Sequence, residues 1–160
     1  MGGGVGGVRL AAWWKFMAAH AQLMQRVGRE LEAARALPLG SYNVLRVLQE
    51  APGYRLRLSE LARAVHLTRS GVTRLVNRLE RAGLLRREGH AQDRRGSCAI
   101  LTDRGRDELR QARAVLERAV AEQFGSRLSD AEAETLSALL GRIVTAEAGS
   151  ATAKARRRPG

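Results

Sequence analysis

The sequence predicts a mainly α-helical fold with a small β-hairpin, which is an α+β winged helix-turn-helix with further helices on its N- and C-terminal sides. Three observations predict this fold. Two short segments of helical spacing meet at a tight turn between residues 58 and 82. Two segments of strand spacing follow at once, joined by a polar connection rich in arginine. Long amphipathic segments flank this unit on both sides.

The first of these long segments is predicted to be a helix from about Arg9 to Ala36. Its apolar residues form two stripes, although a helix with a single buried seam needs only one. We therefore expect one side to pack on the rest of the chain and the other on a second subunit. The stripes are Leu10, Trp14, Met17, Ala21 and Met24, and Trp13, Phe16, Leu23 and Val27.

Proline and glycine separate the segments that follow. Pro38 and Gly40 end the first helix, and Ser41 is predicted to cap a second helix that runs to about Glu50. The pair Pro52–Gly53 then precedes the helix-turn-helix.

The helix-turn-helix consists of a helix from about Ser59 to Val65, with Ser59 as its expected N-cap, and a helix from Arg69 to about Ala82, with Thr68 as its expected N-cap. Gly83 can adopt positive φ and ends the second helix. Apolar residues on one face of that helix must contact a core. These residues are Val72, Leu75, Val76 and Leu79.

The opposite face of the second helix suits the major groove of double-stranded DNA. Arginine can bond the acceptor edge of guanine, asparagine that of adenine, and a hydroxyl either a base or a phosphate. A solvated basic face is the alternative interpretation. The candidate DNA contacts on this helix are Arg69, Ser70, Thr73, Arg74, Asn77 and Arg78.

After Gly83 the spacing of apolar residues becomes that of strands. Residues 84–87 and 97–101 are predicted to pair as a hairpin with a polar tip, which completes a winged unit of about residues 41–101. Adjacent arginines at the tip suit a minor groove of enhanced negative potential.

Two amphipathic helices follow, at about residues 103–124 and 129–147. Thr102 is predicted to cap the first, and Ser129 with Glu132 forms a capping box for the second. With the helix at residues 9–36 they offer more apolar surface than one small core needs, so a homodimer is expected; an intramolecular bundle is the alternative. Two recognition helices about 34 Å apart would then require a pseudo-palindromic operator.

Charge supports a nucleic-acid partner. The net charge is +12, and 26 of the 28 basic residues are arginine. Residues 55–110 hold 14 arginines against seven acidic residues. Because neutralised phosphates release counterions, binding should weaken steeply with salt.

Length and composition bound the other possibilities. The 160 residues suit one domain, here residues 9–147 between ends at 1–8 and 148–160 that we expect to be disordered. One cysteine excludes an internal disulfide and favours the cytoplasm, and nothing predicts a signal peptide or membrane span. Scattered histidines and the lack of phosphate-loop or nucleophile motifs argue against an enzyme, a metal or a cofactor.

Five segments, in their order and separation, resemble the multiple-antibiotic-resistance regulator (MarR) family of bacterial transcription factors. The resemblance covers most of the chain, and the Asp-Arg-Arg motif followed by Leu-Thr-x-x-Gly is its most specific part. The segments are Leu58–Ala62, Thr68–Glu80, Gly83–Leu84, Asp93–Arg95 and Leu101–Gly105.

The resemblance implies a homodimer with interlocked terminal helices, whose DNA affinity responds to small ligands or oxidants. It also implies that Arg95 enters the minor groove, that Asp93 orients it and that Arg94 lies near the DNA backbone; solvation of the loop is the alternative role. Asn77 stands where relatives commonly have an acidic residue, which bears on base preference rather than on docking.

A ligand pocket is implied by the same resemblance. Trp14, Met17, His20 and Tyr42 could enclose a small aromatic or phenolic effector, although each could equally be an ordinary core residue. Cys98 could sense peroxide with help from the charge of Arg86 or Arg87 across the hairpin. Peroxide-sensing relatives, however, place their cysteine near the amino end, where this chain has none.

The sequence therefore predicts a sequence-specific DNA-binding transcriptional regulator that is a repressor released by a small molecule. Repression is favoured because a dimer on promoter DNA blocks polymerase without further parts. Sequence-independent DNA packaging is the alternative, and it is disfavoured by a recognition face that carries Ser70, Thr73 and Asn77.

Overall fold

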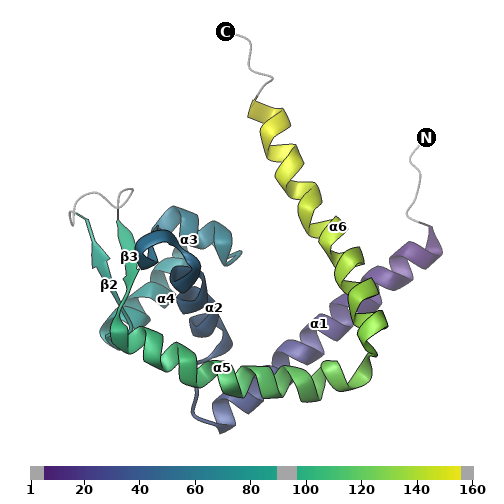
Figure 1. The fold of residues 1–160 in the computed structure, drawn as a ribbon. Coiled ribbons are helices and arrows are strands. Elements are labelled where there is room, and N and C mark those ends of the chain that lie inside the picture. Colours follow the sequence, from purple (N-terminus) through teal and green to yellow (C-terminus); the bar gives the residue numbers. More distant parts are fainter. Residues whose placement is uncertain (1–5, 90–96, 156–160) are drawn as a thin grey trace. The chain divides into compact units, whose positions relative to one another are not determined.

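The computed structural model describes residues 6–89 and 97–155, and the side-chain surroundings up to residue 144. Two compact units divide between Val120 and Ala121 and are described separately. The elements appear in Figure 1. They are α1 (Gly7–Ala33), α2 (Leu39–Glu50), the 3-10 turn Pro52–Tyr54, β1 (Arg55–Arg57), α3 (Leu58–Ala64), α4 (Arg69–Arg81), β2 (Leu85–Glu88), β3 (Cys98–Leu101), α5 (Asp103–Gln123), the 3-10 turn Gly125–Arg127 and α6 (Asp130–Ala155).

The described part of the chain is mainly helical with a small antiparallel sheet, as the sequence predicts. The sheet has the order β1-β3-β2, with Leu85 opposite Leu101 and Glu88 opposite Cys98. The strand β1 was not expected, and it pairs Leu56 with Ala99. Its three residues present one apolar side chain between two arginines, which is too short a pattern to distinguish from a loop.

The winged unit, residues 39–101, is held by a core in which α2, α3, α4 and the sheet each contribute fully buried side chains. The buried face of α4 is the predicted one, because Val72, Val76 and Leu79 are buried and Leu75 is half-buried against them. Burial of apolar side chains of this size stabilises the fold by about 1.5–3 kcal/mol each. This core fixes which face of α4 remains exposed.

The C-terminal part of α1 packs on α5. Val27 and Leu31 are buried with Ala119, and Leu116 lies against them. The helix ends at Ala33 rather than Ala36 because Arg35 takes a positive φ of 52°. The amide of Ala36 then donates to the Leu31 carbonyl at 2.8 Å, which satisfies one of the last helical acceptors.

In the first unit, two predicted helix caps are wrong and two are confirmed. Ser41 lies inside α2, which begins after Pro38, and Ser59 lies inside α3, which Arg57 precedes as N-cap. Both helices therefore start earlier than predicted. The preceding segment ends at Pro38 before α2 and at the extended residue Arg57 before α3. The hydroxyl of Thr68 accepts from the Gly71 amide at 3.1 Å, and that of Thr102 accepts from the Gly105 amide at 3.0 Å.

In the second unit, the capping box at the start of α6 is confirmed. The Glu132 carboxylate accepts from the Ser129 amide at 2.9 Å and from its hydroxyl at 2.8 Å. These bonds, the backbone one first, lower the pKa of Glu132. The helix continues to Ala155, beyond its predicted end near residue 147, through a stretch rich in alanine.

Candidate nucleic-acid interface

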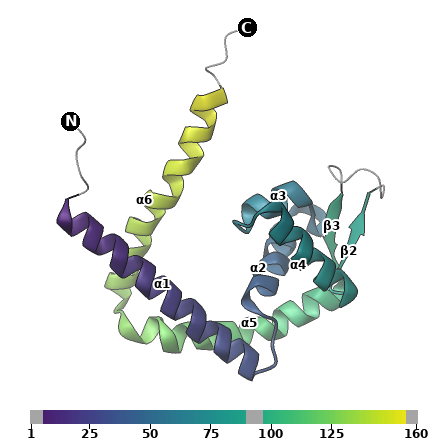
Figure 2. The same cartoon turned by 180° about the vertical axis from the view of Figure 1, so that it is seen from behind.

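The helices α3 and α4 lie side by side and form the helix-turn-helix (Figure 2). The turn between them is made by His66, whose φ of 53° lies in the left-handed region, and the Leu67 amide donates to the Ala62 carbonyl at 2.9 Å. The turn and the Thr68 cap together fix where α4 begins. Its polar face is left open to solvent.

The guanidinium groups of two arginines on that face have no partner among the described residues. Arg69 and Arg74 are exposed, and neither side chain forms a hydrogen bond or an ion pair with any residue that the structure describes. The hydroxyl of Thr73 donates to the Arg69 carbonyl at 2.7 Å, and the Ser70 hydroxyl lies 3.2 Å from that of Thr68. Both hydroxyl oxygens keep acceptor capacity, while the guanidinium groups keep all their donors.

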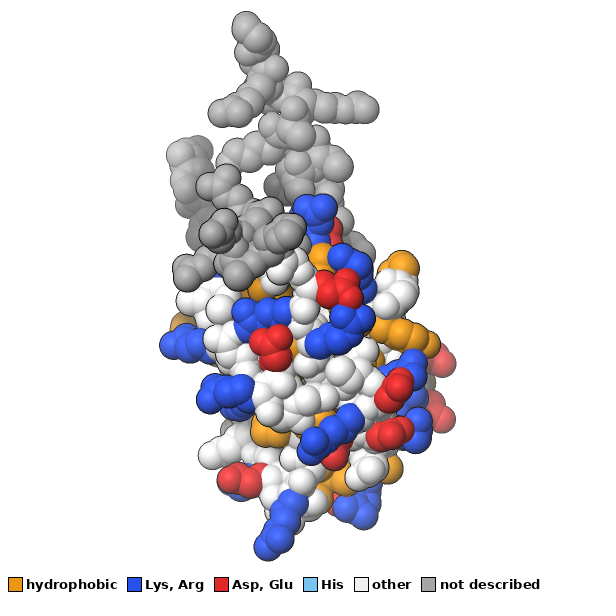
Figure 3. Space-filling model, turned by 90° about the vertical axis from the view of Figure 1, so that its left-hand side faces the viewer, with side chains coloured by type: hydrophobic (Ala, Val, Ile, Leu, Met, Phe, Trp, Pro, Cys, Tyr) orange, Lys and Arg blue, Asp and Glu red, His pale blue; other side chains and the backbone are white. Residues whose placement is uncertain are grey.

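Several arginines on the sheet and on α5 are paired with acidic side chains instead. Figure 3 views the side on which β2 and β3 lie in Figure 1, and basic and acidic side chains alternate there. Ion pairs account for this alternation. They include Arg55 with Glu88 at 3.0 Å, Arg87 with Glu80 at 3.0 Å, and Arg110 with Asp107 at 3.1 Å. The exposed face of α4 is thus one of the places in the described part of the chain where arginines stand without an acidic partner.

The remaining predicted residues of α4 are more constrained. Arg78 donates through Nη2 to the hydroxyl oxygen of Ser41 at 3.2 Å. Asn77 is half-buried, and its backbone carbonyl accepts from Arg81 Nε at 3.3 Å. The structure thus brings Arg69, Ser70, Thr73 and Arg74 together on one open face, with Asn77 at its edge and Arg78 turned toward α2.

The predicted wing tip, with Asp93, Arg94 and Arg95, lies outside the described residues. Its strands end at Glu88 and begin again at Cys98, as a hairpin requires. The minor-groove role of the tip therefore stays a prediction.

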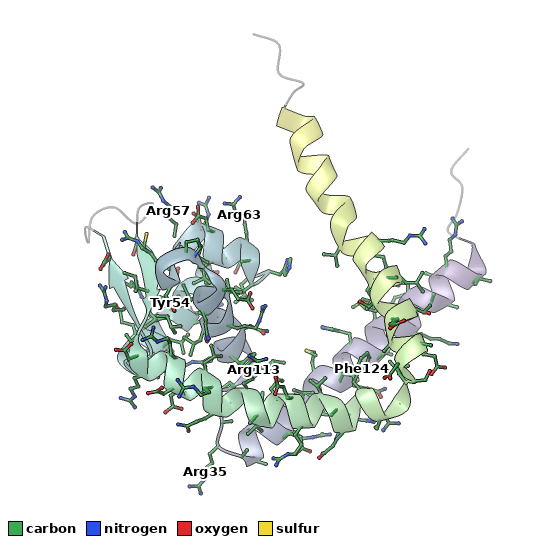
Figure 4. All side chains as sticks on the ribbon, viewed as in Figure 1. Arg35, Tyr54, Arg57, Arg63, Arg113 and Phe124 are labelled. Carbon is green, nitrogen blue, oxygen red and sulfur yellow. The ribbon has the colours of Figure 1, made fainter. Side chains whose placement is uncertain are left out.

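Sequence reasoning missed two exposed arginines of the winged unit. Arg57 and Arg63 point away from its core along one edge (Figure 4), and neither forms an ion pair with a described residue. Arg57 belongs to the unexpected strand β1, and Arg63 lies on the face of α3 away from Leu61. The helical spacing of Arg63 relative to the buried residues of α3 was the available signal.

The surroundings of Cys98 differ from the prediction. Its side chain is buried on β3 opposite Arg57 of β1 and Glu88 of β2, and the arginine that hydrogen-bonds to it is Arg55 of β1 rather than Arg86 or Arg87. A hydrogen bond with Cys98, with smaller electrostatic contributions from Cys98 and Glu88, raises the pKa of the Arg55 guanidinium. Arg86 and Arg87 pair instead with glutamates. Burial withdraws Cys98 from the accessible site that a peroxide sensor needs.

The four residues predicted to line a ligand pocket occupy two different settings. Tyr42 is 7% exposed within the core of the winged unit, whereas Trp14 is 62% exposed on α1. Met17 and His20 are exposed on α1 as well, and the His20 ring stacks on Phe16 with centroids 6.3 Å apart. A pocket formed by these residues stays a prediction.

A cavity of about 460 Å³ lies between the end of α1 and the start of α2. Four of its six lining residues are small or apolar and two are charged, and the side chain of Arg35 points away from the ribbon (Figure 4). The lining residues are Gly28, Glu32, Arg35, Ala36, Pro38 and Leu39.

Comparison with known proteins identifies the fold and the family. Residues 37–96 match the model of the MarR family, and the chain is 38% identical over 122 residues to a protein assigned to regulation of the hcr operon of Thauera aromatica, covering 74% of this chain and 70% of that protein. Sco3205 of Streptomyces coelicolor, a MarR family transcriptional regulator solved in complex with DNA, is 32% identical with a TM-score of 0.78 over 91% of this chain and 90% of its own.

The chain belongs to the MarR family. Membership confirms the predicted winged-helix architecture and the role of transcriptional regulator. A further MarR protein, Rv2887 of Mycobacterium tuberculosis solved with salicylic acid, is 28% identical with a TM-score of 0.61 over 81% of this chain and 93% of its own. Among the described residues of this MarR protein, no helix has the length and hydropathy to cross a membrane.

Proposed function

We propose that this MarR protein is a homodimeric repressor that binds an inverted-repeat operator and leaves it when a small aromatic acid binds. The observation that carries DNA binding is the exposed face of α4, on which the guanidinium groups of Arg69 and Arg74 have no partner among the described residues and lie beside the hydroxyls of Ser70 and Thr73. A guanidinium without a protein partner can bond guanine or phosphate without first giving up another bond.

The proposed docking places α4 in the major groove. Arg74 and Asn77 would reach base edges, while Arg69, Ser70 and Thr73 would bond bases or phosphates near the start of the helix. We further propose that Arg57 and Arg63 contact phosphates along the edge of the winged unit. In the minor groove, Asp93, Arg94 and Arg95 would act as the family resemblance implies.

A second copy of the chain is the proposed partner for the exposed side of α1. Large apolar side chains there are 40% exposed or more, which a monomer seldom tolerates over so many neighbours. An isologous dimer would cover them and would present two copies of α4 to successive major grooves. These side chains are Leu10, Trp13, Trp14, Phe16, Met17 and Met24.

The experiment that tests this function starts from DNA fragments of the source genome that the purified protein retains. Footprinting of a retained fragment should protect an inverted repeat, and the operator duplex should bind at least about 10³-fold more tightly than a scrambled duplex at fixed salt. Light scattering should give the mass of a dimer. Equal affinity for both duplexes would instead support sequence-independent packaging.

Arg74→Ala is predicted to weaken operator binding by about 1–3 kcal/mol and to relax preference at the bases it meets. Fluorescence anisotropy with operator duplexes altered at single positions measures both effects. Arg118→Ala is the matched control, because Arg118 is exposed on α5 and belongs to no described ion pair. An equal loss of affinity for operator and scrambled DNA would show that Arg74 contacts phosphates and not bases.

The effector is proposed to be an aromatic carboxylic acid, because Rv2887 has been solved with salicylic acid and with p-aminosalicylic acid. Trp14, Met17 and His20 would line the pocket once a second copy of the chain covers α1, and Tyr42 would line it from the side of the winged unit.

Salicylate is predicted to release the protein from the operator in an anisotropy titration. Trp14→Ala is predicted to raise the salicylate concentration needed for half-release by about tenfold, the equivalent of 1.4 kcal/mol. An unchanged titration curve in Trp14→Ala would remove Trp14 from the pocket.

Regulation is the whole of the proposed role. The compared relatives are transcriptional regulators, and we propose no catalytic activity for the chain. A regulator that binds the bacterial chromosome must act in the cytoplasm, which is therefore the proposed compartment.

A further inference from the structure

A hydrogen bond joins Arg78 of α4 to Ser41 of α2. Among the described residues, Ser41 is the only polar residue in the buried class, with 2% of its surface exposed. Burying a hydroxyl is costly unless it is hydrogen-bonded. Arg78 Nη2 donates to the Ser41 hydroxyl oxygen at 3.2 Å, across 37 positions of sequence.

An apolar contact lies beside this hydrogen bond. Gly40 faces α4, because a Cβ built on it would be in ordinary van der Waals contact with Cδ2 of Leu75, at 3.9 Å. Leu75 and Arg78 are three positions apart and therefore share a face of α4, on which they meet Gly40 and Ser41 at the start of α2. The contact is thus one apolar and one polar interaction between the same two helical turns.

Arg78 differs from the arginine one turn earlier. Arg74 lies four positions before it, is exposed and has no partner among the described residues, so its guanidinium is available to DNA. The guanidinium of Arg78 is directed to a buried atom of α2 instead. Arg78 is exposed as well, but in this conformation its Nη2 is directed to α2 and is not available to a base on the open face of α4.

We propose that Arg78 is a positioning residue for DNA recognition: its bond to Ser41 fixes the rotation of α4 about its axis, so that Arg74 and Asn77 meet the base edges. This inference rests on the proposed function and revises the assignment of Arg78 as a DNA contact. Base contacts depend on alignment to within a fraction of an ångström, whereas phosphate contacts tolerate small rotations. Loss of the bond should therefore lower specificity more than non-specific affinity.

The test is a double-mutant cycle with Ser41→Ala, Arg78→Ala and the double variant, measured on the retained operator duplex and on its scrambled counterpart over a salt series. Each single change should lower the operator-to-scrambled affinity ratio about tenfold, as loss of one hydrogen bond to a charged group would. The double variant should lose no more than either single variant, because both remove the same bond. The slope of log affinity against log salt should stay that of the wild type.

A direct phosphate contact gives a different pattern. Arg78→Ala would then reduce the salt slope by about 0.9, and Ser41→Ala would leave both affinities unchanged. That result overturns the inference. Arg81→Ala is the matched control for charge on α4, because its guanidinium bonds the Asn77 carbonyl of its own helix rather than α2.

Two further comparisons separate the possible failures. Ser41→Cys keeps the volume of the side chain while weakening the acceptor, and it should reproduce Ser41→Ala if the fold is intact by circular dichroism. If the wild-type protein binds operator and scrambled duplexes equally, both the proposed function and this inference are wrong. If the wild type prefers the operator and Ser41→Cys has the same operator-to-scrambled affinity ratio, only this inference is wrong.

Discussion

Gly105→Ala is expected to destabilise the winged unit by about 3 kcal/mol, near the upper end for overpacked sites. A Cβ at Gly105 would lie 2.0 Å from the Leu84 carbonyl oxygen and 2.8 Å from Cδ1 of Leu101. The first of these atoms is backbone, so relief requires α5 to move away from the start of β2. Such a movement would also strain the hydrogen bond that the Thr102 hydroxyl donates to the Gly83 carbonyl at 2.7 Å.

Urea denaturation followed by circular dichroism, at one fixed protein concentration, measures this loss. Gly28→Ala is the matched control, because Gly28 lies inside α1 and a Cβ there meets nothing within 4 Å. Alanine should stabilise that position by about 0.5–1 kcal/mol through its higher helix propensity. Equal urea midpoints for Gly105→Ala and the wild type would contradict the close packing of Gly105 against the Leu84 carbonyl.

Leu31→Ala is expected to cost about 2–5 kcal/mol, the usual range for removing a fully buried leucine. The Leu31 side chain is fully buried where α1 meets α5, in a small cluster with Val27 and Ala119. So small a cluster has few neighbours that can move into the space left. The loss should appear in the unfolding midpoint and as faster amide hydrogen exchange in the last turns of α1.

The control for Leu31 is Leu67→Ala. Leu67 is also a leucine of the first unit but is exposed in the turn of the helix-turn-helix, so its truncation should cost less than about 1 kcal/mol. A similar loss in the free energy of unfolding for Leu31→Ala and Leu67→Ala would show that the cluster between α1 and α5 does not stabilise the fold.

The parts of the fold that sequence predicted are those with local physical signals. The buried face of α4 follows from apolar spacing alone, and Thr68, Thr102 and Ser129 mark helix starts through hydroxyls that the structure confirms as caps. Positive φ at Gly83, 71°, agrees with the end expected for α4.

The parts that sequence missed depend on distant residues. Ser41 looks like a cap by residue type, yet it is buried because α4 covers the first turn of α2 and Arg78 supplies its partner. The strand β1 exists because β3 offers it an edge, as the pairing of Leu56 with Ala99 shows. No local pattern contains either partner, so neither feature could be predicted from its own segment.

The candidate site shows the same division. The polar face of α4 was predicted as a surface, but which of its arginines are free could be learned only from their neighbours. Arg55 replaced Arg86 and Arg87 beside Cys98 because it comes from the unexpected strand.

The helix α5 is anchored at two points, at Gly105 against the carbonyl of Leu84 and at Ala119 against α1. These residues are 14 positions apart on one uninterrupted helix, or about 21 Å along its axis. A displacement of about 1 Å at Ala119 therefore tilts the rod by roughly 3° about Gly105. Gly105 is packed so closely against the Leu84 carbonyl that α5 cannot tilt without moving the residues at the start of β2. A shift of α1 against Ala119 would therefore be transmitted through α5 to the β2–β3 hairpin.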